Sequence, residues 1–166
     1  MNNKTLNIFL IIIFIFIQLI APVYSFQNEP DGFRALIWGD PPSKISTLQK
    51  SETHKGYDVY INTRDKLEIK GVELTEIGYI FKNNAFIKVT LMATNPKMML
   101  SVLKEEFGDS VNLTPAKTKY NNPSPEYVWT GNKTIIKYQV VNNHAFVDLI
   151  SAKSERESET SEGTGF

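Results

Sequence analysis

Apolar residues are nearly continuous at the start of the chain and become periodic after it. Residues 6–23 hold only two polar side chains, and they follow a short segment that carries Lys4. A basic start, an apolar stretch and modest side chains at Val23 and Ser25 form the order of an export signal. We therefore predict a signal peptide over residues 1–25, with cleavage after Ser25 and a periplasmic or extracellular destination.

The same apolar stretch is nearly long enough to span a bilayer core of about 30 Å. An uncleaved membrane anchor is therefore the alternative, and it would make the protein a membrane-tethered accessory subunit. The amino-terminal residue of the protein recovered from cells, Met1 or Phe26, distinguishes the two.

Alternating apolar and polar positions predict a series of strands after the signal. The predicted strands cover residues 33–39, 57–61, 66–69, 73–82, 85–93, 127–130, 134–141 and 144–150. Two helices separate them: a short one capped by Asp40 and begun by Pro41 or Pro42, and a longer one capped by Asn95 and ended by Gly108. This order predicts an α+β two-layer sandwich, an antiparallel sheet of about six to seven strands with both helices packed on one face.

Two pairs of asparagines mark tight hairpins, because asparagine tolerates the positive φ that two-residue turns require. A turn at Asn142-Asn143 pairs Tyr138 with Val147 and Ile136 with Leu149 on a core face. On the opposite, solvated face it pairs Lys137 with Asp148 and Gln139 with Phe146.

The same rule at Asn83-Asn84 gives two apolar faces near the turn. One is aliphatic, with Ile80, Ile87, Val89 and Leu91; the other carries the aromatic side chains of Tyr79, Phe81 and Phe86. If the helices cover the aliphatic face, these three rings form an exposed surface suited to a partner. The alternative is that the amino-terminal segment, the loop from Leu113 to Pro125 or a bulge near Thr75 buries them.

Composition divides the chain and excludes several classes of function. We expect a flexible lead over residues 26–31, one domain over 32–152 and a disordered polar tail over 153–166. Removing residues 1–25 leaves 17 basic against 18 acidic residues, a balance that disfavours nucleic-acid binding. The absence of cysteine excludes disulfides, thiolate metal sites and thiol nucleophiles.

The remaining candidate chemistry is sparse. His54 and His144 are the only histidines, and neither lies at a spacing used by metal sites. No Gly-rich phosphate loop and no nucleophile elbow is present. We therefore predict no catalytic, metal or cofactor-binding residues, and the protein is expected not to be an enzyme. A periplasmic hydrolase that uses His144 with nearby carboxylates such as Asp148 is the alternative.

A resemblance to a family of proteins indicates the cellular location. The segment Asp31-Gly32-Phe33-Arg34-Ala35-Leu36-Ile37-Trp38-Gly39 resembles the Gly-Phe-Arg-x-x-x-Trp-Gly block that opens the mature domain of a family of small exported bacterial proteins of unknown function. Later motifs in the same order are Gly71-Val72-Glu73-Leu74, Phe107-Gly108 and Tyr127-Val128-Trp129, so the resemblance covers residues 32–150. It implies a bacterial envelope setting and supplies no catalytic residues. We expect a non-catalytic binding or interaction domain of the periplasm, whose partner is an unknown protein or a small envelope ligand.

Overall fold

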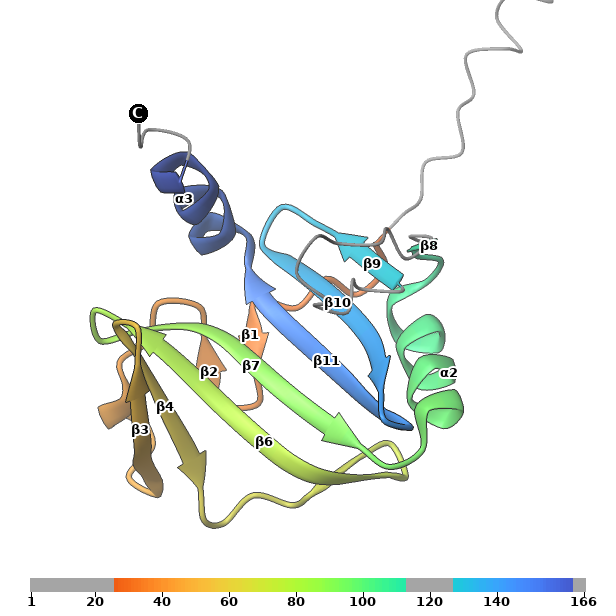
Figure 1. The fold of residues 1–166 in the computed structure, drawn as a ribbon, viewed down its shortest axis with the longest axis horizontal. Helices are drawn as coiled ribbons and strands as arrows, with labels where there is room; N and C mark the ends of the chain where they lie inside the picture. Colours follow the sequence, from red (N-terminus) through yellow and green to blue (C-terminus); the bar gives the residue numbers. More distant parts are fainter. Residues whose placement is uncertain (1–25, 113–126, 163–166) are drawn as a thin grey trace, which may run out of the picture.

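One antiparallel sheet forms most of the structure, a computed structural model that describes residues 26–112 and 127–162 (Figure 1). The predicted signal segment and the loop at 113–125 lie outside these residues. Eight strands lie side by side, in the spatial order β3 (Leu48–His54), β4 (Tyr57–Asn62), β6 (Val72–Lys82), β7 (Ala85–Ala93), β11 (His144–Ser151), β10 (Thr134–Val141), β9 (Tyr127–Thr130) and β8 (Val111–Asn112). Strand β5 (Glu68–Ile69) pairs with β6, and β1 (Gly32–Phe33) and β2 (Leu36–Ile37) form a separate hairpin. The antiparallel sheet is confirmed, with more strands than the six to seven expected.

The helices differ more from expectation. Helix α2 (Pro96–Phe107) has the predicted signals: the Asn95 side chain accepts a hydrogen bond from the Met98 N–H, and Gly108 follows its last turn. The helix expected after Asp40 is only a single 3₁₀ turn, η1 (Pro42–Lys44), which buries no residue. Ile45 directly after this turn is extended and Leu48 pairs with Asn62, so these two apolar residues pack on the core without a longer helix.

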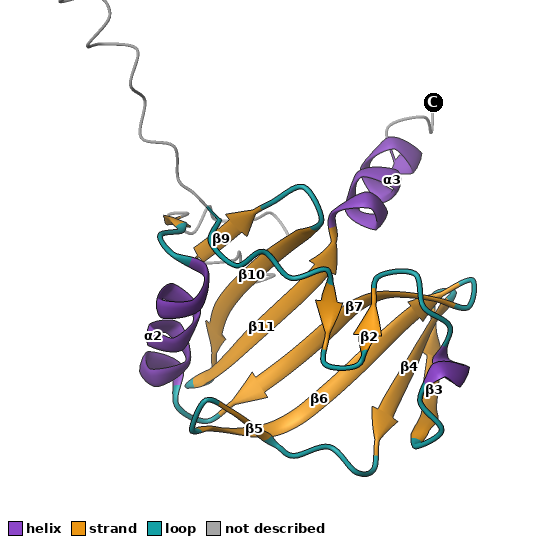
Figure 2. Cartoon of the chain, turned by 180° about the vertical axis from the view of Figure 1, so that it is seen from behind, coloured by secondary structure: helices purple, strands orange, loops and turns teal. Residues whose placement is uncertain are grey.

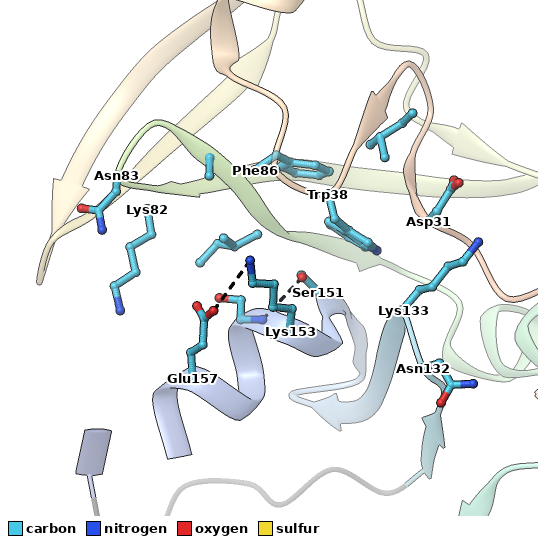
Figure 3. A pocket seen from close by; sticks show the side chains of 15 residues that line it. Asp31, Trp38, Lys82, Asn83, Phe86, Asn132, Lys133, Ser151, Lys153 and Glu157 are labelled. Atoms are coloured by element: carbon cyan, nitrogen blue, oxygen red, sulfur yellow. Dashed lines mark hydrogen bonds and ion pairs between the residues drawn. The ribbon is translucent and has the colours of Figure 1, made fainter. Parts of the chain in front are cut away.

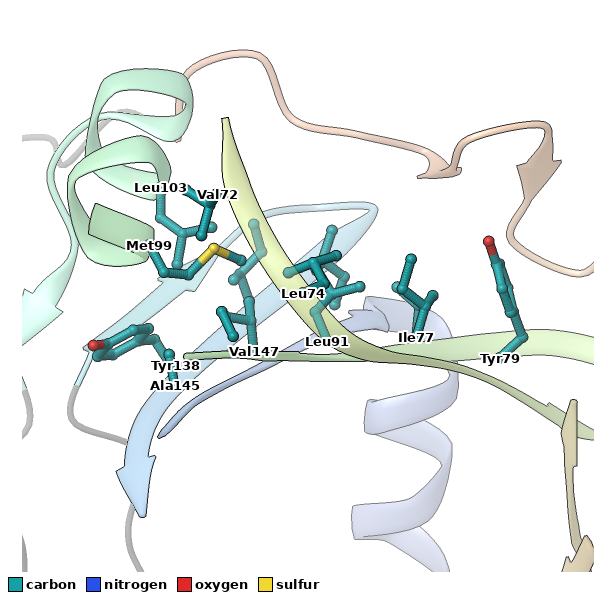
Figure 4. Packing of buried hydrophobic residues seen from close by; sticks show 14 of the residues in the cluster. Val72, Leu74, Ile77, Tyr79, Leu91, Met99, Leu103, Tyr138, Ala145 and Val147 are labelled. Atoms are coloured by element: carbon teal, nitrogen blue, oxygen red, sulfur yellow. The ribbon is translucent and has the colours of Figure 1, made fainter. Parts of the chain in front are cut away.

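A third helix, α3 (Ala152–Glu162), continues directly from β11 and corrects the predicted disordered tail over that range. Its first residue is fully buried, and the Glu155 carboxylate forms an ion pair with Lys137 of the sheet. These attachments hold the helix although its composition is polar. Figure 4 shows α2 above the sheet and α3 below it, so the two α-helices of the structure lie on opposite faces. The pair expected on one face was α2 and the helix after Asp40, and the second of these forms only η1. Within the described residues, no helix has the length and apolar character needed to cross a membrane.

The hairpin at Asn142-Asn143 has the predicted register. Tyr138 pairs with Val147 and Ile136 with Leu149, and all four side chains are buried in the core. Both asparagines have positive φ, at 50° and 64°, as the two-residue turn requires. The turn residues and the alternation of apolar and polar positions predict this register correctly, because no extra residue interrupts the pairing of the two strands.

The hairpin at Asn83-Asn84 departs from its predicted register after one pair. Phe81 lies opposite Phe86 as expected, but Ile80 then pairs with Lys88, which leaves Ile87 as an extra residue in β7. Such a β-bulge shifts every later residue of one strand by one position, and side chains alternate, so the faces exchange. Val89 therefore lies on the same face as Tyr79 rather than opposite it.

The bulge corrects the predicted partner surface. Tyr79, Phe81 and Phe86 are 1%, 1% and 0% exposed, and they share the core with Val89 and Leu91. Their placement on the outside of the sheet is wrong. The opposite face of the sheet carries Ile80, Lys88 and Thr90 at this point.

The amino-terminal segment covers these rings, as the alternative in the sequence analysis held. We call residues 26–40 the N-terminal strap; it crosses the sheet on the face that also carries α2 (Figures 2 and 4). Its hairpin β1–β2, not the predicted single strand, places Phe33 over Tyr79 and Trp38 over Phe86, with ring centroids 5.9 and 4.8 Å apart. Leu36 between them is 1% exposed.

The start of the strap is also attached, which corrects the expected flexible lead at 26–31. The Phe26 ring meets the Phe107 ring edge-on at 5.6 Å, and Gln27 donates its backbone N–H to the Phe107 carbonyl. The Glu29 carboxylate accepts a hydrogen bond of 2.9 Å from the Thr134 N–H. The Gly-Phe-Arg-x-x-x-Trp-Gly block is thus part of the layer that closes the core.

Candidate functional site

A cavity of about 550 Å³ lies where several strand ends meet (Figure 3). We call it the strand-end cavity. Four segments line it: the end of the strap, the β6–β7 turn, the β9–β10 turn and the first two turns of α3. This volume falls in the range of sites that hold small molecules, about 300–1,000 Å³.

Several contacts hold the aromatic part of the lining. Trp38 stacks on Phe86 with an angle of 26° between the rings, and its Nε1 donates a hydrogen bond of 2.7 Å to the Thr134 hydroxyl. Two backbone bonds fix the surrounding chain: Gly39 donates to the Phe86 carbonyl and Phe86 donates to the Asp40 carbonyl, both at 2.8 Å. Ile37 and Ile87 add aliphatic surface, so the lining is apolar and held in one arrangement.

Asp40 secures the bend where the strap leaves the cavity. Its carboxylate accepts the Ile37 N–H at 2.7 Å and the Lys44 ammonium at 2.6 Å. The Lys44 hydrogen bond first, and the Ile37 N–H second, lower the pKa of Asp40 below its ordinary value. Asp40 is therefore ionised at neutral pH and acts as a structural anchor for the aromatic lining.

The rim of the cavity is polar and carries more positive than negative charge. Figure 3 shows Lys82 on one side of the opening, Lys133 on the other and Lys153 between them. The acidic side chains at the rim are Asp31 and Glu157. The Glu157 carboxylate lies 3.9 Å from the Lys153 ammonium, so these two charges largely offset each other.

A second hollow, of about 410 Å³, lies on the sheet face opposite the strap, beside α3. Four of its charged groups form ion pairs, Lys137 with Glu155 and Lys88 with Asp148 at 3.7 Å, and Glu52 is its other carboxylate. Asp148 also accepts a hydrogen bond of 2.6 Å from the Thr90 hydroxyl. Lys137 and Asp148, which the sequence places opposite each other, thus form ion pairs with other residues. This hollow has less unpaired charge to offer a ligand than the strand-end cavity has.

The histidines take no part in a catalytic arrangement within the described residues. The His144 ring nitrogen lies 3.0 Å from the Asn142 carbonyl in the hairpin turn. His144 and Ser151 begin and end β11, roughly 23 Å apart by the rise of a strand, so His144 is remote from the strand-end cavity. His54 is exposed at the border of the second hollow. In the described ranges, no three His, Cys, Asp or Glu side chains are grouped to hold a metal ion.

The sequence analysis missed the strand-end cavity because its lining is drawn from segments more than 100 residues apart. One available signal was the position of the turn residues. Asn83-Asn84 and Gly131-Asn132 end hairpins that the sheet order brings to one end of the sheet, and each is preceded or followed by a lysine. Placing those turns together requires the strand order, which the sequence analysis did not specify.

No family model, no curated protein and no solved structure matches this chain.

Proposed function

We propose that the protein is an exported, non-catalytic binding protein of the bacterial periplasm and that the strand-end cavity is its binding site. The observation that carries this proposal is the cavity itself: about 550 Å³, with an apolar lining held by Trp38 and its contacts and with a polar rim. Small-molecule sites share this combination of preformed apolar walls and a few polar groups that orient the ligand. Of the two partners expected from the sequence, the small envelope ligand is favoured over the protein, because the aromatic surface expected to bind a protein is buried.

The binding interpretation is favoured over hydrolysis by the groups at the rim. A hydrolase of the serine type needs a nucleophile within hydrogen-bond reach of a base that a third group orients. Ser151 and Ser154 border the cavity, but the Ser151 hydroxyl accepts the Ser154 N–H at 3.5 Å, and His144 lies at the other end of β11. The rim therefore supports recognition of a ligand rather than its cleavage.

The proposal of export rests on two features: the signal-like sequence of residues 1–25 and the resemblance of the Gly-Phe-Arg-x-x-x-Trp-Gly block. Phe26, which directly follows the proposed cleavage site, contacts Phe107 and so belongs to the folded domain. Mass measurement of the natural protein tests this step: a chain that begins at Phe26 supports export with cleavage, and one that begins at Met1 supports the tethered form.

Filling the cavity tests the proposed site. Ala85 lines the cavity at the start of β7, so Ala85→Trp places an indole in it; Ala35→Trp, at an exposed turn of the strap, is the matched control. Ligand-detected NMR with a library of small polar and aromatic compounds should find binders of the native protein and of Ala35→Trp that Ala85→Trp no longer binds. Equal binding to all three proteins, or no binder of the native protein, would refute the proposed site.

A further inference from the structure

We propose that the ligand of the strand-end cavity is a small organic anion with an apolar, planar or aliphatic body. This inference rests on the proposed function and adds the chemical class of the ligand. It follows from two independent features, the charge left over at the rim and the apolar lining below it.

The charges at the rim do not cancel. Lys153 is offset by Glu157, as described above. The ammonium of Lys82 lies over the Tyr57 ring, 5.3 Å from its centroid, and has no carboxylate within ion-pair distance among the described residues. Lys133 likewise has none there; its backbone N–H, not its side chain, bonds Glu29. Asp31 is the remaining acid, so two lysines face one aspartate.

The excess positive charge is not spread evenly around the rim. In Figure 3, Asp31 lies on the same side of the opening as Lys133, whereas Lys82 lies on the opposite side, near Lys153. Because Lys153 is offset by Glu157 and Lys133 lies near Asp31, an acidic group of a ligand is attracted most strongly toward Lys82. Asp31 and Asn132 at the other side can accept and donate hydrogen bonds to a second polar group.

The apolar lining favours an organic anion over a bare inorganic ion. Trp38, Ile37 and Ile87 present apolar surface to the cavity. A bare ion would either leave this surface facing water or lose its own hydration in order to contact it. An organic anion buries its body against these side chains and keeps its charged group at the rim, so apolar burial and charge attraction act on one molecule.

Two probes with the same aromatic body test the charge directly. 8-Anilinonaphthalene-1-sulfonate is an anion, and N-phenyl-1-naphthylamine is its counterpart without the sulfonate; both become fluorescent in apolar surroundings. Titration of the full exported chain at low salt should show one site for each probe, with the anion bound more tightly. Both probes should lose this site in Ala85→Trp.

Charge variants then assign the preference. Lys82→Gln with Lys133→Gln should weaken the anionic probe about tenfold and leave the neutral probe within about twofold, the effect expected for two partly solvated charges within about 5 Å of the ligand. Lys66→Gln with Lys97→Gln removes two exposed lysines outside the cavity and should change neither affinity. Raising the salt concentration should reduce only the affinity of the anionic probe.

The possible failures are distinct. If the neutral probe occupies the cavity but the anion binds no more tightly, or if both lysine pairs act alike, the anion proposal is overturned while the binding site stands. If Ala85→Trp changes neither probe, the cavity is not where they bind and the proposed function loses its site.

Discussion

The Tyr79 hydroxyl donates a hydrogen bond of 2.6 Å to Oδ2 of Asp65, a carboxylate that is only 7% exposed. The other oxygen of Asp65 is 2.6 Å from the Arg34 guanidinium and accepts a bond of 2.9 Å from the Asn62 amide. Arg34 also donates to the Lys66 carbonyl at 2.6 Å. A single carboxylate thus joins the strap, the sheet and the loop after β4.

Removal of this carboxylate should destabilise the fold. Asp65→Ala leaves the Tyr79 hydroxyl and the Arg34 guanidinium without their shared partner, and we expect the free energy of unfolding to fall by about 2 kcal/mol. Urea denaturation measures the change. Tyr60→Phe, which removes a hydroxyl from another ring packed on the core, is the control and should change stability by less than about 0.5 kcal/mol. Equal effects of the two substitutions would show that Asp65 does not join these segments.

Alkaline pH should lower the free energy of unfolding through the same contact. Burial first, and the hydrogen bond to Asp65 second, raise the pKa of Tyr79 above its ordinary value of 10.0. The folded state therefore keeps a proton that the unfolded chain releases above about pH 10, so the stabilisation is complete below that pH and is lost as pH rises toward the folded-state pKa.

Urea denaturation at pH 8, 9.5 and 10.5 measures this loss. Tyr79→Phe should be less stable than the native chain at pH 8, by about 1 kcal/mol, and should lose less stability on going to pH 10.5. The Lys70 ammonium, whose pKa is raised by its hydrogen bond to Glu106, adds a loss in the same range that Tyr79→Phe leaves in place. A steeper decline in Tyr79→Phe than in the native chain would contradict the proposed linkage.

Deletion of Ile87 should be far more damaging than its substitution. Without the extra residue, Lys88 and Thr90 would turn toward the core and Val89 and Leu91 toward water, because each position changes face. We expect the deleted chain to lose its near-ultraviolet circular dichroism and cooperative unfolding. Ile87→Val removes one methylene from a half-buried side chain and should cost about 1 kcal/mol or less. A cooperative, native-like deletion variant would mean that the bulge does not set the register.

Gly32→Ala tests how closely the strap hairpin is packed. A Cβ at this position would lie 1.9 Å from the Leu36 carbonyl oxygen and 2.7 Å from the Ile37 Cα, both backbone atoms that cannot rotate away. We expect a loss of at least about 3 kcal/mol and a change in the Trp38 environment seen by fluorescence.

Gly56→Ala is its control, since Gly56 has a φ of 81° but open space around it. Only backbone strain applies there, so a loss of about 1 kcal/mol is expected in urea. If Gly32→Ala is no more damaging than Gly56→Ala, the two strands of the hairpin can separate without consequence.

The parts of the fold that local rules determine could be predicted from the sequence. Asn95, Pro96 and Gly108 bound α2 because capping and φ preferences act within a few residues. The register of β10 and β11 follows from Asn142-Asn143 because the ladder between them is regular. In both cases the residues that determine the structure lie close together in the sequence.

The rest depended on contacts that local patterns do not contain. The bulge at Ile87 has no distinctive residue type, since an isoleucine fits a strand with or without an extra position. Strand β3 was not predicted because its side chains are mostly exposed and charged or polar, and its pairing with β4 defines it. Helix α3 has a polar composition typical of disorder, and its buried first residue and the Lys137–Glu155 pair are visible only in three dimensions.

The strap also constrains the order in which the chain can reach its native state. Glu29 and Trp38 are among the first residues of the domain to be synthesised, yet their hydrogen-bond partner Thr134 is 105 and 96 residues later. The aromatic core therefore stays open until β10 has been synthesised, and a chain stalled before that point exposes the rings of Tyr79, Phe81 and Phe86. The chain is thus most vulnerable to aggregation, and most dependent on chaperones, during its own synthesis.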